Sequence, residues 1–98
     1  MAENQQFDFE RSQQLRSKIT AEIASLDEAL NKVQTKVESV REWWRGGSEE
    51  GFIRNFLSTR RDVRRGLDRW LKDYDRLVRD VERAKQEQER ALEQALRV

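Results

Sequence analysis

The sequence predicts an all-α protein, an antiparallel two-helix hairpin that dimerises into a four-helix bundle. Apolar residues recur at alternating steps of three and four along the first half, which is the spacing of a left-handed coiled-coil seam. The chain has no proline, and its only adjacent glycines, Gly46 and Gly47, lie near the middle. The β-branched residues fall at helical spacing and not in the alternation typical of strands. A single helical-hairpin domain is expected over residues 1–98.

Composition narrows the functional classes. The chain has no His and no Cys, which excludes ordinary zinc sites, thiol chemistry and histidine-based catalytic triads. Lys and Arg number 20 against 19 Asp and Glu, so the net charge of +1 does not steer the whole molecule to nucleic acid or membrane. Charged residues make up 40% and hydrophobic residues 36%, which suits long helices with a narrow apolar stripe. We expect no enzyme activity, no cofactor, no metal site, no small-molecule substrate and no membrane insertion.

The first helix is expected over about residues 9–43. Asp8 is placed to cap its N-terminus, and Glu10 lies at the positive end of the helix dipole. The apolar positions form one stripe, and from Ile23 onward the steps alternate strictly: Leu15, Ile19, Ile23, Leu26, Leu30, Val33, Val37, Val40 and Trp44. Mostly polar residues lie between them, as a solvated face requires.

A tight turn is expected over residues 44–48. Gly46 or Gly47 can adopt the left-handed conformation that ends a helix. Ser48 is positioned to cap the next helix, and the two acidic residues that follow it lie at the positive end of that helix's dipole. The segment therefore predicts a reversal of the chain between two helices.

The second helix is expected over about residues 49–96, and its apolar stripe is broader than that of the first. Adjacent apolar pairs widen the stripe, so the helix can contact two neighbours. A lone hairpin cannot bury both faces of such a stripe, which predicts a second hairpin and a four-helix bundle. After Ala84 the stripe thins, and we expect the tail to fray. The residues predicted at the dimer or partner interface are Ile23, Leu30, Val37, Phe56, Leu67, Trp70, Leu71, Tyr74 and Leu77.

The predicted turn contains a W-x-G motif, Trp44-Arg45-Gly46, near the middle of the chain. It is followed by a Gly-Ser pair, two acidic residues, Gly51 and Phe52. In length, motif position and downstream pattern, the whole chain resembles the WXG family of small early-secreted-antigen-type proteins. The resemblance implies export by type VII secretion, as in Gram-positive bacteria and mycobacteria. It also implies that the W-x-G turn contributes to a composite export signal, together with a tail motif on the same chain or on a partner.

Physical roles for the motif residues can be predicted independently of the resemblance. Trp44 continues the seam of the first helix, so we expect its ring to fold onto the second helix near Phe52 or Phe56. Gly46 permits a backbone geometry that a Cβ atom would strain. Gly51 costs helix stability relative to Ala, and we expect close packing beside Trp44 to offset that cost.

The tail departs from the family pattern, which is Tyr-x-x-x-Asp/Glu after the second helix. The only tyrosine is Tyr74, it lies within the predicted bundle, and the residue four positions later is Val78. Two interpretations follow. Either a partner chain supplies the tail signal, or the protein is an adaptor that is not itself exported.

The most basic stretch lies in the second helix. Some of its charge can be neutralised locally, because Arg64–Asp68 and Arg69–Asp73 have the four-residue spacing of helical ion pairs. Arg60 has no acid at either helical spacing. Three arginines that share one flank form a candidate docking patch for an acidic partner surface: Arg61, Arg65 and Arg69.

These observations favour a non-enzymatic WXG-type protein, either a type VII secretion substrate or the targeting partner of a larger secreted effector. Its partners would be a second copy, or a second WXG-type or LXG-type chain, together with the secretion ATPase. We expect secretion without a cleaved signal peptide, from a cytoplasmic pool. The main alternative is a cytoplasmic coiled-coil scaffold or chaperone-like adaptor with a coincidental W-x-G, and a nucleic-acid-binding hairpin is favoured least because acids interleave the arginines.

Overall fold

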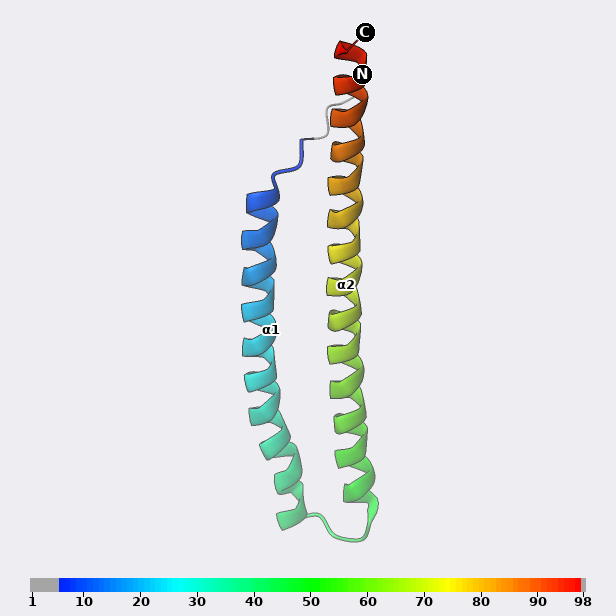
Figure 1. The fold of residues 1–98 in the computed structure, drawn as a ribbon. Coiled ribbons are helices and arrows are strands. Elements are labelled where there is room, and N and C mark those ends of the chain that lie inside the picture. The colour runs from blue at the N-terminus through cyan, green and yellow to red at the C-terminus, as the bar shows by residue number, and fades with distance from the viewer. Residues whose placement is uncertain (1–5, 98) are drawn as a thin grey trace. The chain divides into compact units, whose positions relative to one another are not determined.

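A computed structural model describes residues 6–97 and contains two long helices joined by a short connection (Figure 1). Helix α1 spans Phe9–Glu38, the 3₁₀-helix η1 spans Ser39–Glu42, and helix α2 spans Ser48–Leu96. No strand occurs in the described range. The predicted all-α helical hairpin is therefore confirmed. The chain divides into two units, one ending at Val63 and the other beginning at Arg64, and α2 continues from the first into the second.

Helix α1 begins where the sequence predicts. Asp8 has extended backbone angles, and its carboxylate accepts a hydrogen bond from the backbone N–H of Arg11 at 3.0 Å. This bond satisfies one of the N–H groups that the first turn of a helix leaves without a partner. Glu10 lies in that first turn, where a negative charge is favourable.

The end of the first helix differs from the expectation of continuous α-helix to residue 43. The α-helix ends at Glu38, and the chain tightens into η1 before the turn. Ser39 accounts for the change locally, because its hydroxyl and its backbone N–H both donate to the carbonyl of Lys36. Such i to i+3 bonding is the usual way in which a last helical turn tightens.

Helix α2 begins at Ser48, one residue earlier than predicted, and continues to Leu96. The predicted capping role of Ser48 is wrong. Its position is inside the helix, and its hydroxyl accepts a hydrogen bond from the indole of Trp44. The residues after Ala84 remain helical, and their fraying stays a prediction.

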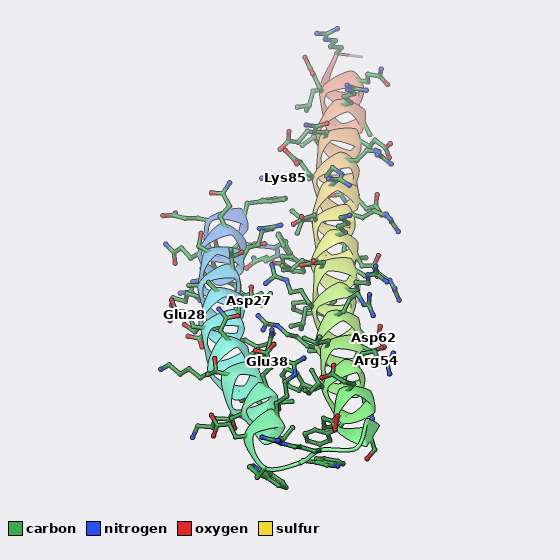
Figure 2. All side chains as sticks on the ribbon, turned by 90° about the horizontal axis from the view of Figure 1, so that it is seen from below. Asp27, Glu28, Glu38, Arg54, Asp62 and Lys85 are labelled. Atoms are coloured by element: carbon green, nitrogen blue, oxygen red, sulfur yellow. The ribbon has the colours of Figure 1, made fainter. Side chains whose placement is uncertain are left out.

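Few side chains of the described chain are buried. Ile23 and Val40 each expose 7% of their surface and Ile53 exposes 2%. Val40 lies in η1 just before the turn and Ile53 lies in α2 shortly after it. Figure 2 shows Arg54 and Asp62 on the side of α2 turned away from α1, which is the solvated face of this part of the helix.

The second unit is the part of α2 that follows Val63. Its ion pairs follow helical spacing, with Arg64–Asp68 at 3.1 Å, Arg76–Asp73 at 3.6 Å and Arg83–Asp80 at 3.7 Å. The Trp70 and Tyr74 rings stack one turn apart, with centroids separated by 6.4 Å. Trp70 and Leu77 nevertheless remain 51% and 62% exposed. Much of the apolar stripe of this unit is therefore uncovered.

Candidate protein-interaction site at the hairpin turn

The backbone of the turn, residues 43–47, is held by hydrogen bonds and by two glycines. The N–H groups of Trp43 and Trp44 both donate to the carbonyl of Val40, at 3.1 and 2.8 Å. Gly46 and Gly47 follow with φ angles of +128° and +102°, and no other described residue has a positive φ. Residues with a Cβ rarely adopt such angles, so the prediction that Gly46 permits a backbone geometry that a Cβ would strain is confirmed.

Trp44 closes the turn by bonding forward onto α2. Its indole Nε1 donates to the Ser48 hydroxyl at 3.2 Å. Its ring contacts Phe52 with centroids 5.5 Å apart and planes inclined by 40°, which confirms the Phe52 alternative of the prediction. Trp44 is half-buried as a result. The motif tryptophan thus joins the last turn before the glycines to the first turns after them.

Trp43 is exposed beside Trp44, and its sequence position alone predicts no role for it. Its ring stacks on that of Trp44 with centroids 6.1 Å apart and planes inclined by 23°, yet 72% of the residue is exposed. Phe52 is 45% exposed. Three aromatic rings in a row, two of them open to solvent, give the turn the composition of a protein-binding hot spot. The adjacent tryptophans were the available signal, although sequence spacing does not say which ring faces solvent.

An ion pair connects the two sides of the turn. Arg41 donates twice to the Glu50 carboxylate, from Nε at 2.9 Å and from Nη2 at 3.3 Å. The hydrogen bond with Glu50 raises the pKa of Arg41, and the hydrogen bond from Arg41 lowers the pKa of Glu50. Both side chains are about half exposed, so the contribution of the pair to stability is small. The ion pair contributes mainly to geometry, because two hydrogen bonds fix the orientation of the Arg41 guanidinium relative to the Glu50 carboxylate.

Glu49 completes the turn from the other direction. Both of its carboxylate oxygens accept from the backbone N–H of Gly47, at 2.9 and 3.0 Å. The two acidic residues at the start of α2 therefore have different partners. Glu49 accepts from the backbone N–H of Gly47 just before the helix, and Glu50 pairs with Arg41. Within residues 6–97, no cluster of three acids is placed to hold a metal ion.

Gly51 does not have the role expected from the sequence. A Cβ atom built at Gly51 would meet no other atom within 4 Å, so the predicted close packing beside Trp44 is wrong. The residue sits on an exposed part of α2. Trp44 packs on Phe52 instead, which lies one residue further along the helix.

Arg60 is the main polar contact between the helices of the first unit. Its guanidinium donates to Gln34 Oε1 and Asn31 Oδ1, each at 2.7 Å, and to the carbonyl of Asp27 at 3.4 Å. Figure 2 shows Asp27 on the side of α1 that faces α2. Arg60 has no acid at helical spacing along α2, and its partners are instead amide and carbonyl oxygens of α1.

The candidate docking arginines are exposed. Arg61, Arg65 and Arg69 form no ion pair or hydrogen bond within residues 6–97. The expected Arg64–Asp68 pair is present. The expected Arg69–Asp73 pair does not form within residues 6–97, where Asp73 pairs with Arg76.

The predicted interface residues differ in exposure. Ile23 is buried within the described chain, so it belongs to the core of the hairpin and is not open to a partner. The exposed members are Trp70 and Leu77. The half-buried members are Leu30, Val37, Phe56, Leu67, Leu71 and Tyr74.

No helix of the described chain is long and apolar enough to cross a membrane. The turn presents an aromatic surface in which Trp43 and Phe52 are exposed. Comparison of the chain with family models, curated proteins and solved structures gives no match.

Proposed function

We propose that the chain is a non-enzymatic WXG-type protein that pairs with a second helical hairpin and takes part in type VII secretion. It would act as a secreted substrate or as the targeting partner of a larger secreted effector. The observation that carries the proposal is the W-x-G turn itself. The Trp44 indole donates a hydrogen bond to Ser48, and its ring packs against Phe52. Two residues later, Gly46 adopts a φ of +128°.

The uncovered apolar surface supports the pairing step. Among residues 6–97 only Ile23, Val40 and Ile53 are buried. Ten large hydrophobic residues are exposed by 37% or more, including Trp43, Trp70 and Leu77. Burial of one such side chain contributes about 1.5–3 kcal/mol, so a partner hairpin would add substantially to the stability of the fold.

The tail motif remains the departure from the family pattern. Tyr74 stacks on Trp70 inside the long helix, and Val78 stands where the pattern requires an acid. In the proposed function, the tail signal is supplied by another chain of the exported assembly. The protein is cytoplasmic before export and leaves the cell by a route that does not need a cleaved signal peptide.

The test is export from a bacterium that carries a type VII system, with and without the secretion ATPase. Export that requires the ATPase is expected, and it is expected to be lost in Trp44→Ala. The control for folding is the helicity of Trp44→Ala measured by circular dichroism, because Trp44 also holds the turn through Ser48 and Phe52. Export that persists at the same level without the ATPase would overturn the proposal. A Trp44→Ala variant that loses only stability would favour the alternative, a cytoplasmic coiled-coil scaffold.

A further inference from the structure

Basic side chains form one continuous row along the second unit of the chain. From Arg65 to Arg83 they recur at alternating steps of four and three residues, and the row continues through Gln86 to Arg90. Residues at this spacing lie on one face of an α-helix, and α2 is unbroken over this range. At about 1.5 Å per residue, the row is about 37 Å long. Its members, called here the basic stripe, are Arg65, Arg69, Lys72, Arg76, Arg79, Arg83 and Arg90.

Every member of the basic stripe is exposed, and most have no partner. Arg76 and Arg83 make long ion pairs with acids of the same helix, at 3.6 and 3.7 Å, and both arginine side chains remain 68% exposed. The other five members make no ion pair or hydrogen bond within residues 6–97. Their charged groups are therefore available to donate to another molecule.

The basic stripe points away from the side of α2 that is already partly covered. Each of its first five members is followed, two residues later, by a half-buried residue: Leu67, Leu71, Tyr74, Val78 and Val81. Two residues turn the helix by about 200°, so the two rows lie on opposite faces. The exposed Trp70 and Leu77 each come one residue after a stripe arginine, about 100° around the helix from it. Burial of the apolar surface by a paired hairpin would therefore leave the basic stripe open.

A row of acids borders the basic stripe on each edge. The acids of one row directly precede four of the stripe arginines: Asp68, Asp75, Glu82 and Glu89. Those of the other row are also spaced seven apart, and the first two directly follow Lys72 and Arg79: Asp73, Asp80 and Glu87. This part of α2 therefore carries three parallel rows of charge, with the basic one between two acidic ones.

The bordering acids determine which polyanion fits. The phosphates of a nucleic acid are all negative, so the two acidic rows would repel them along both edges of the basic stripe. A helix with an acidic row between two basic rows would meet every row with the opposite charge. Two helices that cross at about 20° stay in contact over several turns, as a stripe of this length requires. Six of the seven stripe residues are arginines, whose guanidinium group can bind a carboxylate through two hydrogen bonds.

We propose that the basic stripe is a docking surface for an acidic α-helix of another protein, in which basic residues border the acidic row. The inference goes beyond the proposed function and does not depend on export, because the basic stripe is separate from the apolar surface to which pairing was assigned. The chain would then bind a paired hairpin through one face of α2 and an acidic helix through the opposite face.

The probe is a fluorescent synthetic helix of about four heptads, in which a Glu row at alternating three- and four-residue spacing runs between two Lys rows. Its binding to the full-length chain is followed by fluorescence anisotropy in about 50 mM salt, where surface charges are weakly screened. It should bind about tenfold or more tightly than a peptide of the same composition with its charges scattered around the helix. Equal binding of the two peptides would overturn the proposal, because general charge attraction would then account for it.

Variants locate the binding on the chain. Arg69→Glu with Arg79→Glu should raise the Kd of the probe about tenfold or more, since both side chains lie in the basic stripe. The matched control is Lys18→Glu with Lys32→Glu, which makes the same change in net charge at exposed positions of α1 and should leave the Kd within about twofold. Circular dichroism checks the helicity of both variants. If the glutamate pair does not fold, Arg69→Gln with Arg79→Gln should still raise the Kd about threefold or more. Equal effects at the stripe and control positions would overturn the proposal.

Two further measurements distinguish other occupants of the basic stripe. A DNA duplex of the same length as the probe should bind more weakly than the probe does, and tighter binding of the duplex would assign the surface to nucleic acid. Sedimentation of Arg69→Glu with Arg79→Glu, without the probe, should match that of the wild type. A changed oligomeric state would assign the surface to a second copy of the chain. Either of these results would overturn the proposal.

Discussion

Arg60 of α2 donates to Gln34 of α1 at 2.7 Å, across 26 residues of sequence. The same guanidinium also reaches Asn31, so one cation satisfies two amide oxygens of the opposite helix. This is a charge-assisted contact, yet no carboxylate takes part. It favours one register of the first unit, because a shift of one turn on either helix would leave no more than one of the two amides beside the guanidinium.

Arg60→Ala should lower the free energy of unfolding by about 1–2 kcal/mol, because each amide oxygen loses a charged donor. The control is Arg61→Ala, which removes an exposed neighbour that has no partner within the described residues 6–97 and should change stability by less than about 0.5 kcal/mol. Urea denaturation followed by circular dichroism, at one protein concentration, measures both. Equal losses in the two variants would contradict the assigned role of Arg60.

The two tryptophans of the turn should differ in their contribution to stability. Trp44→Ala removes the contact with Phe52 and the bond to Ser48, and about 2–3 kcal/mol of unfolding free energy should be lost. Trp43→Ala removes a ring that is 72% exposed, so the loss should stay below about 1 kcal/mol. Thermal unfolding of the two variants side by side is the measurement. If Trp43→Ala were the more damaging change, the packing described for the turn would be wrong.

Alanine substitutions should have opposite signs at two glycines of the turn region. Gly46→Ala forces a side chain into a φ of +128°, which should cost about 1–2 kcal/mol. Gly51→Ala adds a methyl group into open space on a helix, and it should stabilise the chain by up to about 1 kcal/mol. Equilibrium unfolding of the two variants distinguishes these outcomes. Destabilisation by Gly51→Ala would contradict the open space described at Gly51 and would favour the predicted close packing beside Trp44.

The Arg41–Glu50 pair predicts a specific pH dependence. The pKa of Glu50 is lowered in the folded chain by its hydrogen bond from Arg41, so the unfolded chain binds the proton more readily. The stabilisation is therefore complete above the ordinary glutamate pKa of 4.5, and it is lost as the pH falls through the lower folded value.

The measurement is the difference in Tm between wild type and Glu50→Gln from pH 7 to pH 3. Wild type should be slightly more stable near neutral pH, and the difference should vanish in acid. Glu42→Gln is the matched control, because Glu42 is exposed and makes no ion pair within residues 6–97. A difference for Glu50→Gln that stays constant with pH would show that the ion pair is not the cause.

Local patterns account for what was predicted correctly. The three-four spacing of apolar residues specifies helices, Asp8 specifies where the first begins, and Gly46 specifies where the chain reverses. Each of these depends on residues within about one turn of one another, so the sequence alone determines them. The packing of Trp44 near the start of α2 follows too, because a turn of five residues leaves its ring few other neighbours.

The tertiary structure decided the features that depend on the offset between the two helices and on where the second helix begins. Arg60 reaches Gln34 only because the hairpin closes at a particular offset, and Ser48 does not cap α2 because it is already the first residue of that helix. Gly51 was expected beside Trp44, but the position that meets the Trp44 ring is one residue further along α2. Gly51 therefore faces solvent, and Phe52 packs on the ring of Trp44. Spacing along one helix has a fixed period of 3.6 residues, whereas the offset between two helices is set by the summed packing of many side chains and cannot be read from any single motif.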